Sequence, residues 1–303
     1  MVTPDLSAIR DIYPFEPHYA DINGHRLHYV DEGPRDGRPI VMVHGNPTWS
    51  FYYRELIKHF ATRGYRTIAP DHIGCGLSDK PPKTAYDYTL KNRTGDFTAL
   101  LDQLGLEQKI VLVMHDWGGM IATQYATQNP DKIAAMVVLN TAAFTKPADK
   151  PLPVRLKLVR HLWPFGKPMV LGLNAFARCA TFMSVVRPLP KQVKRGLLLP
   201  YNSWANRIAT YEFVRDIPLK PGDKAYGIVK ETENNLPRLK DVPIQVYWGL
   251  KDFVFDADYL ALWEKYFPDA KVKRYADKGH YIVEEALPDI LTGMEELLQT
   301  NKL

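Results

Sequence analysis

Asp116 stands at a point of the chain where a strand is expected to turn sharply into a helix. The residues before it, 111–114, are apolar, and Trp117 is followed by Gly118 and Gly119. Glycine permits a tight turn and a close approach of the following helix to the strand. A carboxylate is already charged at neutral pH, so it can attack an electrophilic carbon directly and form an ester. The pattern predicts a carboxylate nucleophile, with an aspartate that only caps the helix as the simpler alternative.

Two later residues could complete a catalytic triad with Asp116. Asp252 follows the apolar run 242–248 and a glycine turn, and His280 follows Gly279 after another expected strand. Nucleophile, acid and histidine occur in this order in the α/β-hydrolase fold, whose nucleophile stands on a strand-to-helix elbow. His280 would take a proton from water, and Asp252 would orient the imidazole and stabilise its charged form.

Each of these two residues alone has a simpler interpretation. Asp252 could be a turn residue, and His280 could be one of nine histidines placed by chance. Asp116, Asp252 and His280 all occur where a catalytic triad of this fold needs them, and the three together favour catalysis. Asn140, at the end of another expected strand, carries no charge and is excluded as the acid.

The loop 44–49 follows another apolar run, 40–43. In this fold such a loop supplies one backbone amide of the oxyanion hole, and the residue after the nucleophile supplies the other. Asn46 and Trp117 also carry neutral N–H donors on their side chains. Neutral donors suit a halide better than an alkoxide, which needs a proton from an acid. We expect Asn46 and Trp117 to stabilise a halide or an oxyanion, with turn formation before Pro47 and simple packing as alternatives.

Strands and helices alternate along the chain, beginning with an expected hairpin across Asn23 and Gly24 and ending with a helix over 287–299. A proline-interrupted helical stretch breaks the alternation between Thr141 and Gly227. The alternation predicts an α/β-hydrolase fold with a mostly parallel eight-stranded sheet and helices on both faces.

The interruption divides the chain into two expected units. Residues 1–141 and 227–303 would form the α/β core, and residues 142–226 would form a helical cap inserted after the sixth strand. A cap above the elbow excludes water and shapes the substrate pocket.

Several motifs resemble the haloalkane dehalogenase family: His44-Gly45-Asn46-Pro47, His115-Asp116-Trp117-Gly118-Gly119, and the late pair Asp252 and His280. The place of the acid and the Asn-plus-Trp pair are similar to the third subfamily. Four longer stretches resemble the β-lactone decarboxylases of bacterial long-chain olefin biosynthesis, which overlap that subfamily: 44–54, 71–80, 200–209 and 248–255.

The resemblance extends from about Tyr19 to the C-terminus, with one departure. Met114 stands two residues before the nucleophile, where many hydrolases of this fold have glycine, so the elbow is packed differently from that of a serine esterase.

The resemblance implies one of two reactions at Asp116. A dehalogenase would displace halide from an alkyl carbon and then hydrolyse the ester with water activated by His280. A β-lactone decarboxylase would attack the strained four-membered ring, with loss of CO₂ and formation of an alkene, and the ring atom attacked stays open. We expect the lactone to be the natural substrate and haloalkane turnover to be a shared capability.

Two other functions remain open on the sequence. An epoxide hydrolase also uses an aspartate nucleophile but needs cap tyrosines, for which Tyr201, Tyr211 and Tyr226 are available. Asn46, a neutral donor expected beside Asp116, argues against an epoxide hydrolase. A non-catalytic receptor on the same fold is disfavoured by the intact triad.

Composition fits one enzyme of 303 residues. Cys75 and Cys179 are too few for a disulfide framework and indicate a reducing interior. The N-terminal residues lack the pattern of a signal peptide, and no stretch is long and apolar enough to span a membrane, so we expect a cytoplasmic location. The sequence shows no metal-ligand spacing and no phosphate loop, so we expect no cofactor and no metal.

Positive charge is concentrated in one stretch. Residues 146–195 contain eleven Lys and Arg and one acid, a net of +10 against +5 for the whole chain. Within it, residues 154–163 alternate basic and apolar side chains. A solvated surface is the simpler interpretation, and an anionic membrane surface or a partner biosynthetic enzyme is the alternative. We expect a small-molecule substrate and no nucleic acid, because no nucleic-acid motif is present; a homo-oligomer stays open.

Overall fold

The computed structural model of the protein describes residues 4–146 and 166–303. The alternating basic and apolar stretch 154–163 lies outside the described residues.

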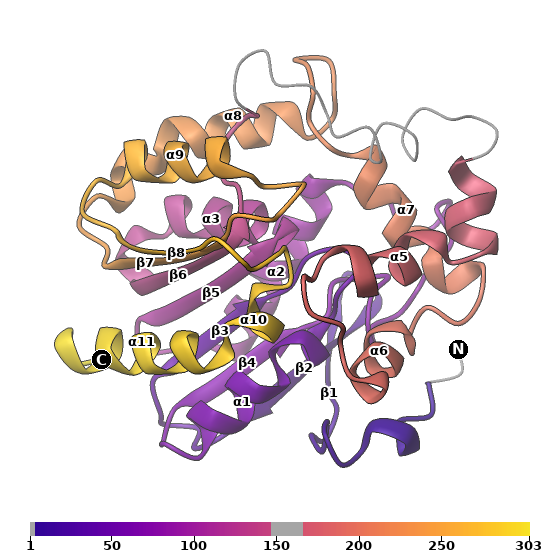
Figure 1. The fold of residues 1–303 in the computed structure, drawn as a ribbon, viewed down its shortest axis with the longest axis horizontal. Coiled ribbons are helices and arrows are strands. Elements are labelled where there is room, and N and C mark those ends of the chain that lie inside the picture. Colours follow the sequence, from indigo (N-terminus) through magenta and orange to yellow (C-terminus); the bar gives the residue numbers. More distant parts are fainter. Residues whose placement is uncertain (1–3, 147–165) are drawn as a thin grey trace.

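One twisted sheet of eight strands forms the centre of the molecule (Figure 1). Its spatial order is β1-β2-β4-β3-β5-β6-β7-β8, in which β1 pairs with β2 and β2 with β4 antiparallel while the other neighbours are parallel. The mostly parallel eight-stranded sheet predicted from the sequence is confirmed. The strands are β1 (His18–Ile22), β2 (His25–Glu32), β3 (Pro39–Val43), β4 (Arg66–Pro70), β5 (Ile110–Asp116), β6 (Ile133–Thr141), β7 (Ile244–Gly249) and β8 (Lys271–Tyr275).

Helices cover both faces of the sheet (Figure 1). On one face lie α1 (Arg54–Ala61), α10 (Ile282–Glu285) and α11 (Leu287–Thr300). The other face carries α2 (Leu90–Leu104), α3 (Trp117–Gln128), α8 (Tyr226–Asn235) and α9 (Ala257–Tyr266). Short 3₁₀ turns connect some of them: η1 (Ser7–Ile9), η2 (Ser50–Tyr53), η3 (Pro130–Lys132) and η6 (Leu236–Leu239).

The central strands are apolar at nearly every position because both of their faces are buried. In β3, Val41 and Val43 pack with the α2 and α3 side, whereas Ile40 and Met42 pack with the α1 and α11 side. This alternation follows from the two-residue repeat of a strand, and it fixes the direction in which each strand delivers its last residue.

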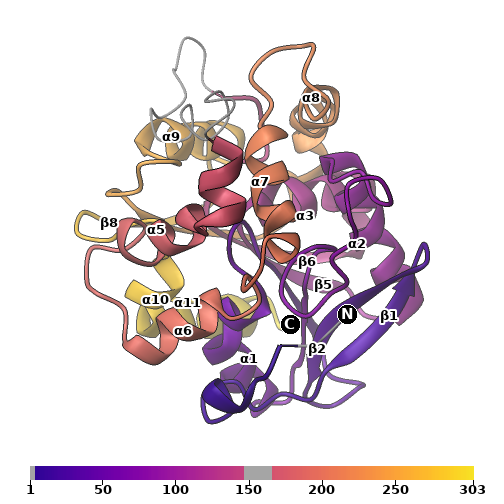
Figure 2. The ribbon, with the colours of Figure 1, turned by 90° about the vertical axis from the view of Figure 1, so that its right-hand side faces the viewer.

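The described residues between β6 and β7 up to α8 contain helices and turns but no strand. They form η4 (Pro168–Gly172, a single π-helical turn), α5 (Ala175–Met183), α6 (Lys191–Leu198), η5 (Ala205–Arg207) and α7 (Ile208–Arg215). These elements lie together at one end of the sheet and face the viewer in Figure 2.

Buried hydrogen bonds attach these helices to the rest of the chain. The indole of Trp49 donates to the carbonyl of Gly196 at 3.0 Å, and the Tyr201 hydroxyl donates to the carbonyl of Thr48 at 3.0 Å. Breaking either bond would leave a buried polar group without a partner, which is costly. The two bonds therefore hold this segment against the loop that carries Asn46.

Candidate active site

Asp116 is the last residue of β5 and directly precedes α3. Its backbone has φ 53° and ψ −125°, a conformation that non-glycine residues rarely adopt. A Cβ at Gly118 would collide with the carbonyl of Val43, so the helix lies as close to β3 as glycine allows. The Thr141 hydroxyl donates to the Asp116 carbonyl and holds the turn from the neighbouring strand. The expected sharp turn from strand to helix is therefore present.

Two backbone amides hold the Asp116 carboxylate. The N–H of Asn46 donates to Oδ1 at 2.7 Å, and the N–H of Trp117 also bonds the carboxylate. Burial raises the pKa of Asp116 above its usual value, whereas the charge of His280 and these two N–H groups act in the opposite direction. Gly45 is required here because a Cβ at that position would collide with the Asp116 carboxylate.

His280 lies between the carboxylates of Asp116 and Asp252. Its Nε2 lies 3.6 Å from Oδ2 of Asp116, and its Nδ1 lies 2.7 Å from Oδ2 of Asp252. Burial alone would lower the pKa of His280, but the charge and the hydrogen bond of Asp252 raise it above its usual value. The three residues that the sequence placed in one triad are brought together, and all three are buried.

Asn140 is a site residue to which sequence reasoning assigned no role. Its Nδ2 donates to Oδ2 of Asp252 at 3.0 Å, and its Oδ1 accepts from the N–H of Gly249 at 2.8 Å. The backbone N–H of Val254 donates to the other Asp252 oxygen at 2.7 Å. Asn140 therefore orients the acid instead of replacing it. Its position at the carboxyl edge of β6 was the available signal, but only the fold shows that it contacts Asp252.

His115 fixes the backbone beside the triad. Its Nε2 donates to the carbonyl of His280 at 2.9 Å, and its ring centroid lies 4.5 Å from that of His280. Burial lowers the pKa of His115 well below its usual range, so its ring is neutral and adds no competing charge. Nothing in the sequence distinguished this role from those of the other histidines.

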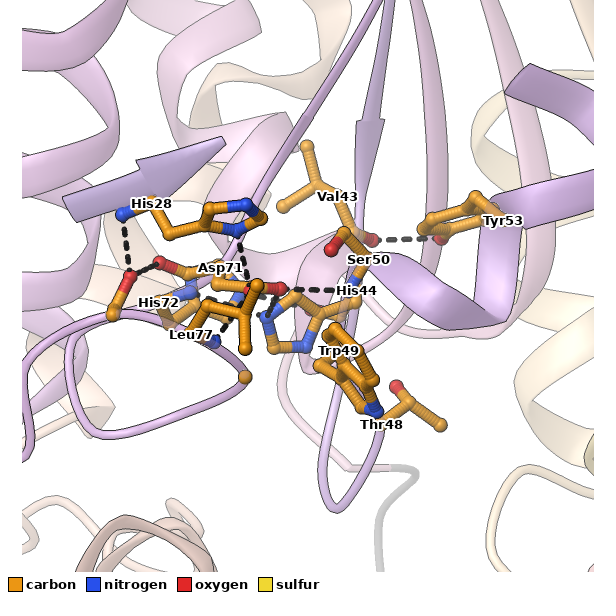
Figure 3. A network of polar contacts seen from close by, with 12 residues as sticks. His28, Val43, His44, Thr48, Trp49, Ser50, Tyr53, Asp71, His72 and Leu77 are labelled. Carbon is orange, nitrogen blue, oxygen red and sulfur yellow. Dashed lines mark hydrogen bonds and ion pairs between the residues drawn. The ribbon is translucent and has the colours of Figure 1, made fainter. Parts of the chain in front are cut away.

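A buried polar network around Asp71 lies beside the loop 44–49 (Figure 3). Asp71 accepts hydrogen bonds from the backbone N–H groups of Ser50 (2.7 Å) and Leu77 (2.8 Å), and from Nδ1 of His28 (2.8 Å). Burial alone would raise the pKa of Asp71, but the interactions with His28 hold it below its usual value. A charged Asp71 is thus satisfied on both oxygens, and it anchors the end of the loop.

The other part of this network joins His44 to His72. The N–H of His72 donates to Nε2 of His44 at 3.1 Å, and Nε2 of His72 donates to the His44 carbonyl at 2.8 Å. Nδ1 of His44 must then carry the proton, which it donates to the carbonyl of Gly45 at 2.7 Å. These bonds fix the peptide units that precede Asn46 and so aim its N–H at Asp116.

The side chains of Asn46 and Trp117 both line the cavity above Asp116. Asn46 Nδ2 uses one N–H to donate to the carbonyl of Thr210 at 3.1 Å, which ties this residue to α7. The ring centroid of Trp117 lies 5.4 Å from that of Phe213, which is also on α7. The two expected donors therefore lie beside the nucleophile, and α7 holds each of them in place.

The cavity has a volume of about 370 Å³ and is almost wholly apolar, apart from the residues of the site at its base. Its apolar and weakly polar lining comprises Pro47, Met120, Met169, Val170, Ala175, Phe176, Cys179, Ala180, Met183, Ser184, Val214, Ile217, Phe253, Val254, Phe255 and Tyr259. Among the described residues no group of His, Cys, Asp and Glu could hold a metal ion. A small apolar molecule is the ligand that such a lining accepts.

The tyrosines expected for an epoxide hydrolase do not contribute to this lining. Tyr201 is buried and donates to a backbone carbonyl, and neither Tyr211 nor Tyr226 lines the cavity. Tyr259 of α9 does line it, a residue that sequence reasoning did not single out. Burial raises the pKa of its hydroxyl well above the usual value.

The Asp252–His280 pair predicts a characteristic pH dependence. If His280 is the base that activates water, it must be neutral, so the rate of ester hydrolysis should fall as pH decreases through the raised pKa of His280. Asp252→Asn removes the charge that raises this pKa, while burial, which lowers it, remains. We expect the acid limb of the kcat profile to move to lower pH, and the plateau to drop on the order of 10²–10⁴-fold.

The measurement is kcat against pH for bromoalkane hydrolysis by both proteins. Asp277→Asn is the matched control, because this carboxylate lies near His280 in the chain but is exposed and bonds Lys278. An acid limb at the same pH in wild type and Asp252→Asn would show that Asp252 does not set the pKa of His280.

The chain is similar to known proteins over most of its length. Residues 38–287 match the family described as alpha/beta hydrolase fold. A cis-3-alkyl-4-alkyloxetan-2-one decarboxylase from Shewanella oneidensis is 48% identical over 288 residues, which cover 95% of this chain and 89% of that protein. A haloalkane dehalogenase from Mycobacterium marinum is 31% identical over 293 residues, 92% of each chain.

A solved structure gives the same fold. The haloalkane dehalogenase DatA from Agrobacterium tumefaciens C58 superposes with a TM-score of 0.83 at 24% identity, covering 94% of this chain and 97% of the other. Fold, family match and relatives confirm the resemblance drawn from the motifs. The chain belongs to the α/β-hydrolase family of enzymes, in the group that contains the haloalkane dehalogenases and the cis-3-alkyl-4-alkyloxetan-2-one decarboxylases.

Proposed function

We propose that Asp116 is the nucleophile of this enzyme, that His280 is its base and that Asp252 orients His280. The observation that carries the proposal is the Asp116 carboxylate, held by two backbone amides beside His280 and facing an apolar cavity. A carboxylate so placed is aimed and desolvated, which favours attack on carbon. The same two amides, of Asn46 and Trp117, stabilise an oxyanion that forms on the Asp116 ester.

We also propose that residues 142–226 form a cap over a core of residues 1–141 and 227–303. In support, η4 and α5 supply much of the cavity lining, and α7 adds Val214. The core supplies the charged groups at the base of the cavity and part of its apolar wall, including Met120, Phe255 and Tyr259, and these helices supply the rest of the wall.

The substrate that we propose is a lipophilic cis-disubstituted β-lactone. It is supported by the apolar lining and by the 48% identity to a cis-3-alkyl-4-alkyloxetan-2-one decarboxylase. Asp116 attacks the alkyl-bearing ring carbon C4, so an ester C–O bond forms while the bond between C4 and the ring oxygen breaks and leaves a free carboxylate. Loss of CO₂ then breaks the C2–C3 bond, whose electron pair forms the alkene and expels the Asp116 carboxylate. Asp116 is released unchanged and no water is consumed, which an apolar cavity favours.

Haloalkane hydrolysis is the second proposed activity, supported by the Asn46 and Trp117 side chains beside Asp116. The carboxylate displaces halide, whose negative charge the two N–H donors stabilise. His280 then takes a proton from water, and the resulting hydroxide attacks the ester carbonyl. Alcohol is released, and the proton left on His280 is lost to solvent.

The two reactions should respond differently to the side chains of Asn46 and Trp117. We expect Asn46→Ala and Trp117→Phe to slow dehalogenation more than lactone turnover, because only a departing halide needs the side-chain donors. Loss of one donor at developing charge costs about 2–4 kcal/mol, or roughly 30- to 1,000-fold in rate. The backbone N–H groups that hold Asp116 remain in both variants.

Single-turnover rates with a bromoalkane and with a β-lactone of equal chain length measure this difference. Trp204→Phe, which changes an exposed indole outside the cavity, serves as the control. Equal losses on both substrates would assign the two side chains to packing or to a step that the reactions share.

One parallel product analysis tests the proposed function. Wild-type enzyme receives a β-lactone, a bromoalkane and an epoxide of matched chain length. We expect alkene and CO₂ in equal amounts from the lactone, alcohol and bromide from the bromoalkane, and unchanged epoxide. A hydroxy acid from the lactone would overturn the decarboxylase assignment, and rapid diol formation would favour an epoxide hydrolase. No product from any of the three would favour a non-catalytic receptor.

The remaining proposals concern location and partners. Among the described residues no helix is long and apolar enough to cross a bilayer. We propose a cytoplasmic enzyme whose substrate is a small molecule. Association of the basic segment with an anionic membrane surface or a partner enzyme is a proposal that rests on its charge. Formation of a homo-oligomer stays open.

A further inference from the structure

Exposed apolar side chains concentrate on the outer surface of the proposed cap. Of the large hydrophobic side chains in the described residues that are clearly exposed, all but Leu250 come from residues 169–204. They are Met169 (46%), Leu173 (67%), Phe182 (60%), Val186 (51%) and Trp204 (48%). A single exposed apolar residue is ordinary, but such a concentration marks an interaction surface.

These side chains come from elements that pack together. Met169 lies on η4 and Leu173 directly follows it, and η4 contacts both α5 and η5. The Trp204 ring lies against Gly172, where an added Cβ would be 3.6 Å from its Cζ3. Phe182 lies on the outer side of α5. We call Met169, Leu173, Phe182 and Trp204 the mouth surface.

The mouth surface adjoins the wall of the cavity. Met169 lines the cavity and is 46% exposed, so this one side chain belongs both to the cavity wall and to the mouth surface. Phe176, Cys179 and Met183 of α5 line the cavity, whereas Phe182 of the same helix is exposed to the outside. A helix with apolar residues on opposite sides is normally covered on both. The outer side of α5 therefore fits an apolar cover.

The charge around the mouth surface is positive. Residues 166–204 contain six Lys and Arg and no Asp or Glu. Lys167 and Arg178 are exposed, and Arg178 stands four residues before Phe182 on the same helical side. Four acids from other elements lie near this segment. Asp11 bonds Gln192, and Glu285 accepts from the N–H groups of Val186 and Arg187. Asp5 and Asp277 interact electrostatically with Arg195 and Arg187.

We propose that the mouth surface docks on an anionic lipid bilayer. Its apolar side chains enter the boundary between headgroups and acyl chains, while Lys167 and Arg178 pair with lipid phosphates. A lipid surface supplies negative charge and an apolar phase together, and Met169 joins the contact to the wall of the cavity. A lipophilic substrate can then pass from the acyl region to Asp116 without crossing water. The identity of that substrate rests on the proposed function, whereas the docking does not.

Vesicle co-sedimentation without substrate tests the docking alone. The probes are vesicles that contain phosphatidylglycerol and vesicles of phosphatidylcholine only. We expect wild type to bind the anionic vesicles, and to bind them much less at about 1 M salt, where the Debye length is about 3 Å. Leu173→Ser/Phe182→Ser and Lys167→Glu/Arg178→Glu should each lower the partition coefficient by about tenfold or more.

Matched controls carry the same chemical changes elsewhere. Leu250→Ser removes the exposed apolar residue outside the mouth surface, and Arg238→Glu/Lys240→Glu reverses two exposed charges near η6. Both controls should bind as wild type does. None of the residues changed in the variants or controls lines the cavity, so every protein should hydrolyse a short, water-soluble bromoalkane at the wild-type rate.

The outcomes separate docking from chemistry. A wild type that binds both vesicle types equally, or controls that lose as much binding as the mouth-surface variants, would overturn the docking proposal. So would variants that retain binding but lose self-association or capture of an acidic protein. Normal docking with no turnover of any substrate would instead refute only the proposed function. If the docking proposal and the proposed function both hold, the two mouth-surface variants should turn over vesicle-embedded lactone more slowly than wild type does. They should turn over detergent-dispersed lactone at the wild-type rate.

Discussion

The Asp116→Asn variant is expected to lose turnover of every substrate class. A neutral amide cannot form the alkyl ester, so kcat should fall on the order of 10⁴-fold or more for both lactone and bromoalkane. Folding should be retained, because the N–H of Asn46 can still donate to the side-chain oxygen of the substituted amide. Burial raises the pKa of Asp116, so the charged carboxylate is itself unfavourable to bury, and the thermal midpoint of the variant should equal or exceed that of wild type.

Kinetics on freshly prepared protein measure this effect, with the thermal midpoint determined on the same sample. Fresh protein is required because slow deamidation of the new asparagine would restore the aspartate and part of the activity. Asp116→Ala, which cannot revert in this way, is the companion variant. Full activity in fresh Asp116→Asn would refute the covalent mechanism.

The second large effect is expected from His280→Phe. Its Asp116 can still displace halide, but without the imidazole no group activates water, so the alkyl ester should persist. One bromide should be released per enzyme in a burst, followed by turnover slowed by roughly 10³-fold or more. Phenylalanine retains the stacking of the ring on Phe255, and Asn140 and Val254 still donate to Asp252.

Intact-protein mass spectrometry after exposure to a bromoalkane measures the trapped ester. The mass should rise by one alkyl group less one hydrogen, and peptide mapping should place it on Asp116. The double variant His280→Phe/Asp116→Asn should gain no mass. An unmodified His280→Phe that still turns over bromoalkane at the wild-type rate would remove His280 from the mechanism.

The sheet and the meeting of Asp116, Asp252 and His280 could be predicted because their signals are local. β3 and β5 are short apolar runs, as strands buried on both faces must be. The apolar strand pattern ends at Asp116, and Gly118 and Gly119 follow at the start of a helix. Together these signals indicate the sharp turn from strand to helix. Asp252 and His280 each follow a strand, and parallel strands deliver the residues after their carboxyl ends to one edge.

The supporting contacts could not be predicted, because each one joins residues that are distant in the sequence. Asn140 contacts Asp252 across 112 positions, His115 contacts His280 across 165, and Asn46 contacts Thr210 across 164. No periodicity relates such pairs, and their side chains are ordinary in type. Tyr201, which the sequence offered as a candidate acid, is a similar case. Only the fold shows that its hydroxyl donates to the carbonyl of Thr48.

The way the Asp116 carboxylate is held bears on how enzymes of this group diverge. The Asp116 carboxylate accepts from the main-chain N–H groups of Asn46 and Trp117. Every residue type except proline provides such a group. Mutations at these two positions can therefore change the leaving-group preference while the nucleophile keeps its aim. If Asp116 is the nucleophile, we expect a library randomised at positions 46 and 117 to contain active members for both reactions.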